Sequence, residues 1–197
     1  MHGSDSAAAA PARSARLRWL VIVVAIIVVL TAGWPLINLA VSDNSHVAAN
    51  TTLTVGPSHK DSAQVTMGPG WTMQSAQSNP HVAYSLRRGG VTMSIVYVPL
   101  LSRSDTGGLW RGMSQILRIS QPGTSLSRPV PITSAHGIRG DAGLITGRTM
   151  RGTVAVFANP PRQYAVEIVV IAPRSTPLAS LVAAQRIMRS LLFPAAP

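Results

Sequence analysis

A long apolar run occupies the N-terminal part of the chain. No charged residue lies between Arg18 and Asp43, and residues 19–41 form a stretch of 23 mostly apolar positions. A helix of that length rises roughly 34 Å at about 1.5 Å per residue, enough to cross a hydrocarbon core of about 30 Å. The pattern therefore predicts a transmembrane helix over 19–41, with Pro35 as a break near its C-terminal end.

The basic residues on either side of this run indicate its orientation. Arg13, Arg16 and Arg18 precede it, and the next Lys or Arg is Lys60. Positive residues favour the cytoplasmic side of a membrane. We therefore expect residues 1–18 to be a cytoplasmic tail. The predicted location is the cell membrane, with a single pass, the N-terminus in the cytoplasm and the C-terminal domain outside.

A cleavable signal peptide is the alternative interpretation of the same segment. Val47 and Ala49 fit the −3 and −1 positions of a cleavage site. The apolar run is longer than the core of about 7–15 residues that is usual in signal peptides, which favours retention as an anchor. Both interpretations place the folded part outside the cytoplasm, and cleavage near Ala49 stays open.

The polar segment 42–62 differs from the chain on both sides of it. It contains a Gly-Pro pair and few apolar residues, which predicts a stalk or linker between the membrane and a folded domain. Alternating and helical apolar patterns begin after it and continue almost to the C-terminus. We assign residues 63–194 to one extracytoplasmic domain.

The clearest local pattern in this domain is a β-hairpin over residues 81–98. Apolar residues alternate along both arms, and Arg88-Gly89-Gly90 supplies the turn. The alternating residues are Val82, Tyr84 and Leu86 before the turn and Val91, Met93, Ile95 and Tyr97 after it. Three further strand-like segments cover residues 142–151, 152–158 and 163–173.

Two segments show helical spacing instead. Residues 108–120 place five apolar side chains on one helix face, namely Leu109, Trp110, Met113, Ile116 and Leu117. Residues 176–193 do the same with Leu178, Leu181, Ala184, Met188, Leu191 and Leu192. The order of the elements predicts an α+β fold, in which one antiparallel sheet packs against two helices.

Two short motifs, together with this order of elements, resemble a known family of domains. A Pro-Gly-Trp start in GPGW (68–71) and a terminal helix ending in IMRSLLF (187–193) resemble the Mog1/PsbP-like domains, which include the LpqN-type lipoproteins of actinobacteria. The resemblance covers about residues 65–193. It implies a non-catalytic accessory or binding domain, with no active site to carry over. LpqN-type lipoproteins carry a lipidated cysteine, whereas this chain contains none, so the predicted N-terminal helix would be its anchor.

The charge of the chain narrows the choice of partner. There are 17 Lys and Arg against 6 Asp and Glu, which gives a formal net charge of +11. Nucleic acid is a poor partner for a domain outside the membrane, and no surface of alternating basic and aromatic residues is apparent. Anionic lipid headgroups or acidic wall polymers are closer candidates. The arginines are spread along the chain, so dispersed solubilising charge is the alternative.

The sequence offers no catalytic or metal-binding pattern. The carboxylates of the predicted domain lie on different elements, namely Asp61, Asp105, Asp141 and Glu167. None of the histidines His46, His59, His81 and His136 forms a pair with metal-ligand spacing. No serine lies in a G-x-S-x-G elbow, and without cysteine there is no thiol chemistry. We therefore expect no enzyme, no metal and no cofactor.

Two exposed turns are the candidate contact sites. Arg87 and Arg88 are the adjacent arginine pair of the chain and lie at the predicted hairpin tip. The glycine-rich segment HGIRGDAGLITG (136–147) predicts a turn or bulge with Arg139 and Asp141 at its tip. The alternative for both is ordinary surface.

The pattern as a whole predicts a non-catalytic, membrane-anchored accessory module of an envelope system for secretion, transport or wall assembly. Its expected partners are the lipid bilayer and an envelope protein. The alternative is a secreted or tethered domain that binds an apolar or anionic ligand, held in a cavity lined by Trp71, Trp110 or Tyr84.

Overall fold

The computed structural model describes residues 44–100, 106–120, 122–161 and 163–194. They belong to one compact unit that begins at Asp43. The predicted tail (1–18) and the predicted transmembrane helix (19–41) lie outside the described residues. Within the described ranges, no helix is both long enough and apolar enough to span a membrane.

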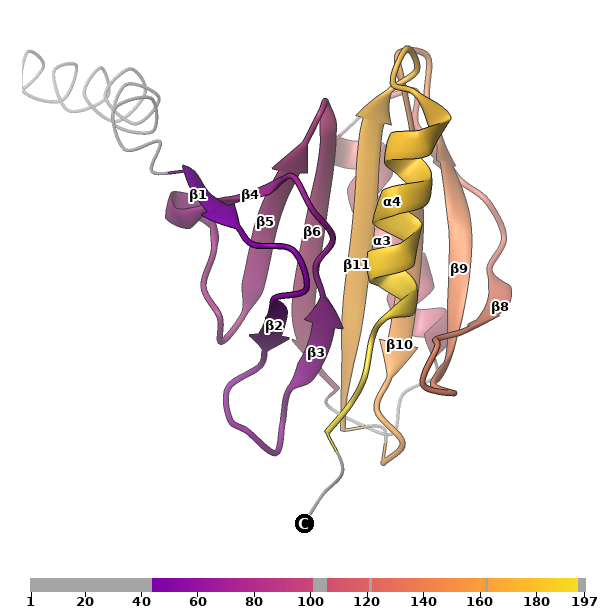
Figure 1. The fold of residues 1–197 in the computed structure, drawn as a ribbon. Coiled ribbons are helices and arrows are strands. Elements are labelled where there is room, and N and C mark those ends of the chain that lie inside the picture. Colours follow the sequence, from indigo (N-terminus) through magenta and orange to yellow (C-terminus); the bar gives the residue numbers. More distant parts are fainter. Residues whose placement is uncertain (1–43, 101–105, 121, 162, 195–197) are drawn as a thin grey trace, which may run out of the picture. The chain divides into compact units, whose positions relative to one another are not determined.

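The domain is built on a nine-stranded sheet whose paired neighbours are all antiparallel (Figure 1). Its strands are β1 (Asn44–Val47), β4 (Trp71–Gln74), β5 (Ala83–Arg88), β6 (Val91–Pro99), β7 (Ser125–Leu126), β8 (Val130–Thr133), β9 (Arg139–Thr146), β10 (Met150–Ala158) and β11 (Tyr164–Pro173). The spatial order is β1-β4-β5-β6-β11-β10-β9-β7, and β8 also pairs with β9. The predicted antiparallel sheet is confirmed.

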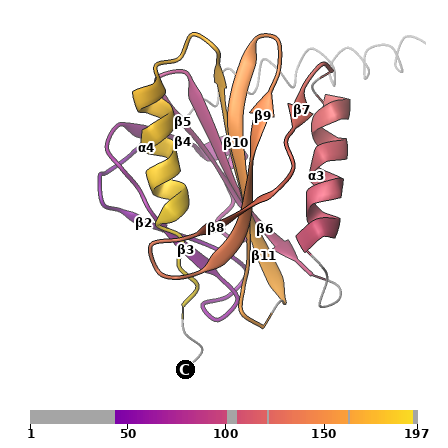
Figure 2. The same cartoon turned by 90° about the vertical axis from the view of Figure 1, so that its right-hand side faces the viewer.

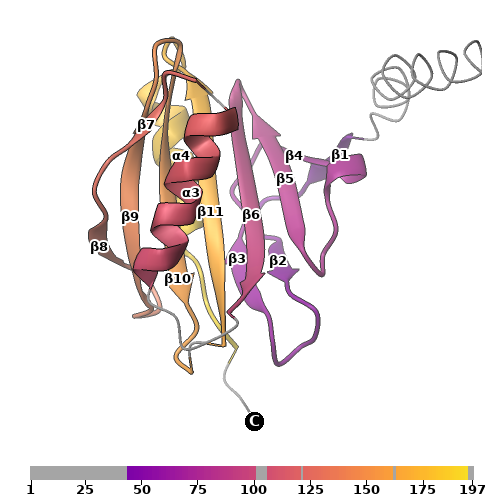
Figure 3. The same ribbon diagram turned by 180° about the vertical axis from the view of Figure 1, so that it is seen from behind.

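Two helices cover opposite faces of this sheet. Helix α3 (Thr106–Ser120) lies on one face and α4 (Leu178–Arg189) on the other, as the edge-on view and the view from behind show (Figures 2 and 3). A separate hairpin of β2 (Thr52–Val55) and β3 (Ala63–Thr66) lies on the α4 side, and a short 3-10 helix, η2 (Ser75–Gln77), follows β4. The two predicted helices are confirmed, and they form the outer layers of a sandwich.

The hairpin predicted over residues 81–98 is present as β5 and β6. Gly89 and Gly90 connect them with φ angles of 47° and 80°, and two successive positive φ values are typical of the tight turns that match strand twist. Tyr84 and Leu86 are buried, as the alternation predicts. Val82 is 51 % exposed, because it precedes the first strand residue and does not reach the core.

Two hydrophobic cores stabilise the domain, one on each face of the sheet. The larger core packs Ala184, Ile187 and Met188 of α4 against the sheet and the β2–β3 hairpin. The smaller core packs Trp110, Met113 and Leu117 of α3 against the sheet. These α3 residues are three and four positions apart, so they form a narrow stripe. Ile116, predicted on this face, is 66 % exposed, as is Leu178 at the first turn of α4.

The stalk predicted over residues 42–62 is wrong for the described part of that segment. Residues 44–47 form β1, which pairs with β4, and residues 52–55 form β2, which pairs with β3. Each strand buries one side chain, Val47 or Val55, and exposes most of the others. The folded domain therefore begins near Asn44 rather than near residue 63.

The glycine-rich segment 136–147 also differs from the prediction. Residues 139–146 are strand β9, and within this segment only Gly137 has a positive φ, 79°. Two of its glycines permit close packing: a Cβ on Gly140 would lie 2.4 Å from the Val156 carbonyl oxygen, and one on Gly143 would lie 2.6 Å from the Trp110 ring. These glycines are therefore explained by close approach within the sheet and against α3.

Candidate binding grooves

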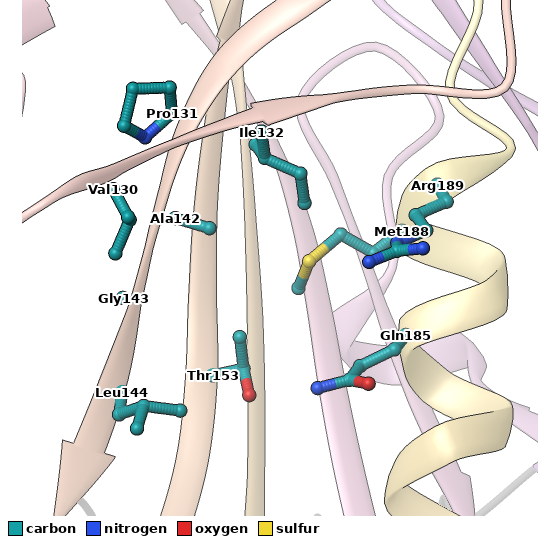
Figure 4. A pocket seen from close by; sticks show the side chains of 10 residues that line it. All are labelled: Val130, Pro131, Ile132, Ala142, Gly143, Leu144, Thr153, Gln185, Met188 and Arg189. Atoms are coloured by element: carbon teal, nitrogen blue, oxygen red, sulfur yellow. The ribbon is translucent and has the colours of Figure 1, made fainter.

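The described surface is hollowed on both sides of helix α4. On one side, two adjoining cavities of about 260 and 290 Å³ lie between α4 and strands β8, β9 and β10. They share Leu144, Thr153 and Gln185, so we treat them as one groove, the α4–β9 groove. Figure 4 shows the half that includes Met188 and Arg189, in which Gln185 extends from α4 toward Thr153 and Met188 extends toward Ile132.

Exposed apolar side chains gather along this groove. Of the seven large hydrophobic residues that are exposed in the described ranges, four line it: Val130, Leu144, Leu178 and Val182. Val130 is 59 % exposed and Leu144 is 60 % exposed. Contiguous apolar surface of this kind marks interaction sites more often than isolated exposed residues do.

An arginine lines each half of the α4–β9 groove. Arg189 lines the half near Met188, and Arg151 lines the half near Leu178. One terminal nitrogen of Arg151 donates a hydrogen bond to the Thr176 carbonyl, whereas its Nε is buried without a partner in the described structure. The arginine at this end is therefore held in place by the loop that leads into α4.

A second groove lies on the other side of α4 and has a volume of about 570 Å³. We call it the α4–β3 groove. One wall is the end of β3 and the loop that follows, and the other wall is α4. Its lining comprises Asn50, Thr66, Met67, Gly68, Pro69, Arg88, Ala179, Val182, Ala183, Arg186, Ile187 and Ser190.

The cations of the α4–β3 groove are Arg88 and Arg186. Arg88 is half-buried and lies over Gly70, where an added Cβ would be 3.5 Å from its Nε. Among the described residues, the carboxylates are Asp61, Asp141 and Glu167, and none of them lines this groove. The groove thus combines two arginines with an apolar floor that includes the buried side chains of Met67 and Ile187.

The predicted contact pair at the hairpin tip is divided between two faces. Successive strand residues point to opposite sides of a sheet. Leu86 is buried in the core on the α4 side, so Arg88 shares that side and lines the α4–β3 groove. Arg87 is exposed on the opposite side, in register with Thr72 and Thr92 of the neighbouring strands.

The second predicted pair, Arg139 and Asp141, lies far from the first. Both residues line a cavity of about 470 Å³ with the turn before β9 and the end of β10. Asp141 is in register with Val156, toward the end of the sheet where Tyr97 pairs with Val166. Arg88 pairs with Val91 at the other end. The four predicted residues therefore do not form one surface.

The structure brings two carboxylates to one face of the sheet without joining them. Asp141 and Glu167 are each in register with Val156, one on either side of it. Their strands are therefore two spacings apart, about 9.5 Å. Burial raises the pKa of Glu167 above its ordinary value. His136 is exposed in the turn before β9 and belongs to neither strand.

Other features of the described residues bear on cofactors and ligands. No cluster of three or more potential metal-ligating side chains is found in the described ranges. Trp71, Tyr84 and Trp110 are packed in the two cores and line none of the four cavities discussed here. The aromatic-lined cavity of the alternative interpretation is therefore not found at these three residues. Neither α4 groove was predicted from the sequence, since the walls of both come from distant segments.

Comparison with known proteins supports the fold. No protein-family model and no curated protein sequence matches the chain. Among solved structures, the Ran-binding protein Mog1p of Saccharomyces cerevisiae is similar, with a TM-score of 0.50 and 13 % identity over 74 % of this chain and 96 % of that one. The cyanobacterial PsbP of Synechocystis has a TM-score of 0.53 and 11 % identity, over 75 % of this chain and 95 % of that one. The described domain thus has a Mog1/PsbP-like α+β fold.

Proposed function

We propose that the chain is a non-catalytic interaction module, anchored in the cell membrane, that binds a protein partner outside the cytoplasm. The observation that carries the proposal is the α4–β9 groove, where Val130, Leu144, Leu178 and Val182 expose apolar surface together. Removing such surface from water contributes about 25 cal/mol per Å², from which the cost of association must be subtracted. A partner that presents apolar side chains to this groove would gain that energy.

The arrangement of the acidic and histidine side chains in the described residues agrees better with binding than with catalysis. Catalytic sites need convergent acid, base or nucleophilic groups within a cleft. Asp141 and Glu167 share a face but are separated by Val156, and His136 is an exposed residue of the turn before β9. The similarity to Mog1p adds one known case of this fold in a binding protein, since that structure is described as Ran-binding.

The membrane part of the proposal comes from the sequence pattern of residues 1–41. Three arginines precede a charge-free apolar run, as expected for a single-pass anchor with its N-terminus in the cytoplasm. The partner would then be a component of an envelope system for secretion, transport or wall assembly. We keep the predicted contact residues as three separate candidates: Arg88 in the α4–β3 groove, Arg87 on the opposite face of the sheet, and Arg139 with Asp141 near the turn before β9.

Site-specific crosslinking in cells tests the groove. A photoreactive residue replaces Leu144 in the C-terminally tagged full-length chain, and the crosslinked partner is identified after purification from membranes. The matched control carries the same residue at Ile119, which is 73 % exposed on α3, on the opposite face. We expect one envelope protein to be enriched from position 144 and absent from position 119. Equal crosslinking at both positions would contradict a specific groove.

The same sample tests the anchor, because mass spectrometry of the purified chain shows whether residues 1–12 remain attached. Retention of this segment supports the membrane anchor. A chain that begins near Asn50 would instead support the secreted alternative.

Charge reversal tests the hairpin tip. The double variant Arg87→Glu/Arg88→Glu should lose partner retention without unfolding, if the tip adds to the partner contact. The control Arg111→Glu/Arg128→Glu reverses two other exposed charges. If the Arg87→Glu/Arg88→Glu variant retains the partner as the unmodified chain does, the hairpin tip is not part of the proposed interface. The crosslinking experiment tests the α4–β9 groove independently of this result.

The second candidate function is that of a ligand-binding domain. It is favoured by the α4–β3 groove, where two arginines adjoin an apolar floor. This groove lies on the opposite side of α4 from the proposed partner groove, so both functions can belong to the same domain.

A further inference from the structure

We propose that the α4–β3 groove binds an anionic phospholipid, with Arg88 and Arg186 contacting its phosphate region and the apolar floor contacting the adjoining acyl chain. The inference deepens the second candidate function, the binding of a ligand in this groove, and it rests on the proposed membrane anchor. It is carried by three observations on the described residues, namely the state of the two arginines, the floor and the fixed walls. The position of the domain after the predicted membrane segment is a fourth argument.

The two arginines are available for an anion. Neither guanidinium has a hydrogen-bond or ion-pair partner among the described residues, whereas Arg151 and Arg174 each donate to a backbone carbonyl. The described carboxylates lie outside the groove. A guanidinium matches a phosphate group with two parallel N–H···O bonds, which makes arginine well suited to this ligand.

The floor of the groove distinguishes a lipid from a free phosphate. The apolar surface that a ligand can reach comes mainly from Pro69, Val182 and Ala183, of which Val182 is 44 % exposed, while the side chains of Met67 and Ile187 are buried beneath it. Inorganic phosphate would gain nothing from this surface. An acyl chain gains about 0.8 kcal/mol for each methylene that it buries. The combination of cations and apolar floor therefore fits an amphiphilic anion.

The walls of the groove are fixed by hydrogen bonds between segments that are distant in sequence. The Thr66 amide donates to the Ser190 hydroxyl at 2.8 Å, and Gln64 exchanges backbone bonds with Leu192 at 2.8 and 2.9 Å. The backbone N–H of Asn50 donates a hydrogen bond to the Met67 carbonyl at 2.8 Å. A groove that already has its bound shape loses less conformational entropy on binding.

The position of the domain along the chain makes a membrane lipid the available amphiphile. Because β1 begins at Asn44, only Ser42 and Asp43 separate the folded domain from the predicted membrane segment 19–41. The predicted stalk of 21 residues is thus reduced to these two residues of sequence. Asn50, six positions after the start of β1, lines the groove itself.

Thermal unfolding of the full-length chain in neutral detergent tests the proposal. The probes are dioctanoyl phosphatidylglycerol, dioctanoyl phosphatidylcholine with the same acyl chains, and inorganic phosphate. Unfolding is followed by tryptophan fluorescence, since Trp71 is fully buried in the domain. We expect phosphatidylglycerol to raise the midpoint in a concentration-dependent way, and the other two probes to leave it unchanged.

Three variants locate the site. Arg88→Gln and Arg186→Gln should each weaken the apparent affinity for phosphatidylglycerol about tenfold, as expected for the loss of one charged hydrogen-bonding group. Ala179→Phe keeps both charges but fills the groove from an exposed position on α4, and it should also abolish the shift. The control Arg111→Gln/Arg128→Gln changes two arginines outside the groove and should bind as the unmodified chain does.

The proposal is overturned by any of four results. These are no shift with phosphatidylglycerol, an equal shift with phosphatidylcholine, an equal shift with inorganic phosphate, or an undiminished shift in the combined variant Arg88→Gln/Arg186→Gln. Leu144 is unchanged in all of these variants, so failure of lipid binding is separate from failure of the proposed partner groove.

Discussion

The Tyr164 hydroxyl donates a hydrogen bond to the backbone carbonyl of Ser62 at 2.8 Å, across 102 positions of sequence. Tyr164 belongs to the central strand β11, and Ser62 directly precedes β3. The Tyr164 ring also contacts Tyr97 with ring centroids 5.0 Å apart, and Phe193 at 5.5 Å. One buried tyrosine thus joins the main sheet, the β2–β3 hairpin and the segment after α4.

We expect this tyrosine to give the domain an alkaline limit of stability. Burial, with smaller contributions from Tyr97 and Asp61, raises the pKa of Tyr164 from 10.0 to about 12. In the unfolded chain the hydroxyl ionises near pH 10, so between pH 10 and 12 the unfolded state binds fewer protons than the folded state. The free energy of unfolding should therefore fall as the pH rises through this range, by about 2 kcal/mol in total.

Tyr164→Phe provides the control for this pH dependence. The variant should be less stable at pH 7 by about 1 kcal/mol, because the Ser62 carbonyl loses its donor. Its free energy of unfolding, measured by urea denaturation, should decline less steeply above pH 10 than that of the unmodified chain. An identical decline in both proteins would show that other groups cause the alkaline loss.

Truncation should show where the folded domain begins. A chain comprising residues 44–197 keeps β1 and β2 and should unfold cooperatively. A chain comprising residues 63–197 loses the buried Val47 and Val55 and also the Thr54 carbonyl that accepts the Tyr84 hydroxyl at 3.0 Å. Burial of one such side chain contributes about 1.5–3 kcal/mol, so the shorter chain should be at least about 3 kcal/mol less stable. Circular dichroism during heating measures the unfolding midpoint of each chain. Equal midpoints would show that residues 44–62 do not contribute to the folded domain, as the stalk prediction states.

Gly143 should tolerate no side chain, unlike the exposed glycines of α3. A Cβ at this position would lie 2.6 Å from the Trp110 ring and 2.9 Å from the Ser127 hydroxyl. Gly143→Ala should therefore reduce the free energy of unfolding by about 1–3 kcal/mol, the usual cost of overpacking. Gly112→Ala adds the same methyl where nothing lies within 4 Å, and it should stabilise the helix by about 0.5–1 kcal/mol. Urea denaturation of both variants gives the comparison.

Substitutions at the two glycines of the β5–β6 turn should differ in their effect on stability. Both have positive φ, and the preferred pair in such turns is Asn-Gly. Gly89→Asn should change the free energy of unfolding by less than about 0.5 kcal/mol, whereas Gly90→Ala should cost about 1–2 kcal/mol. Thermal midpoints measure the difference. Equal losses in both variants would indicate that another turn geometry is adopted.

Local patterns were sufficient for the elements that are formed by neighbours in sequence. The β5–β6 hairpin was predicted because its two glycines and two alternating arms lie within 18 residues, from 81 to 98. The α3 and α4 helices were predicted because their apolar side chains recur at helical spacing. Ile116 was assigned to the wrong face because a helix over a sheet buries a stripe whose width is set by the strands beneath it.

Strands that depend on distant partners could not be predicted in the same way. Strand β1 has only Val47 buried, and its register is set by β4, beginning at Trp71. The glycines of β9 suggested a turn, but Gly140 and Gly143 are needed for close contact with Phe157 and Trp110. Such contacts arise only when the strands and α3 have packed together.

The sequence by itself determined the α+β class, the order of the main elements, the hairpin turn and the excess of arginine. It did so because turn chemistry and apolar periodicity are properties of adjacent residues. The tertiary structure decided the start of the domain at β1, the separation of Arg87 from Arg88 onto opposite faces, and both grooves along α4. Arg88 and Arg186 line one groove because the Arg88 side chain, at the end of β5, is on the face of the sheet that α4 covers, although the two segments are far apart in the chain.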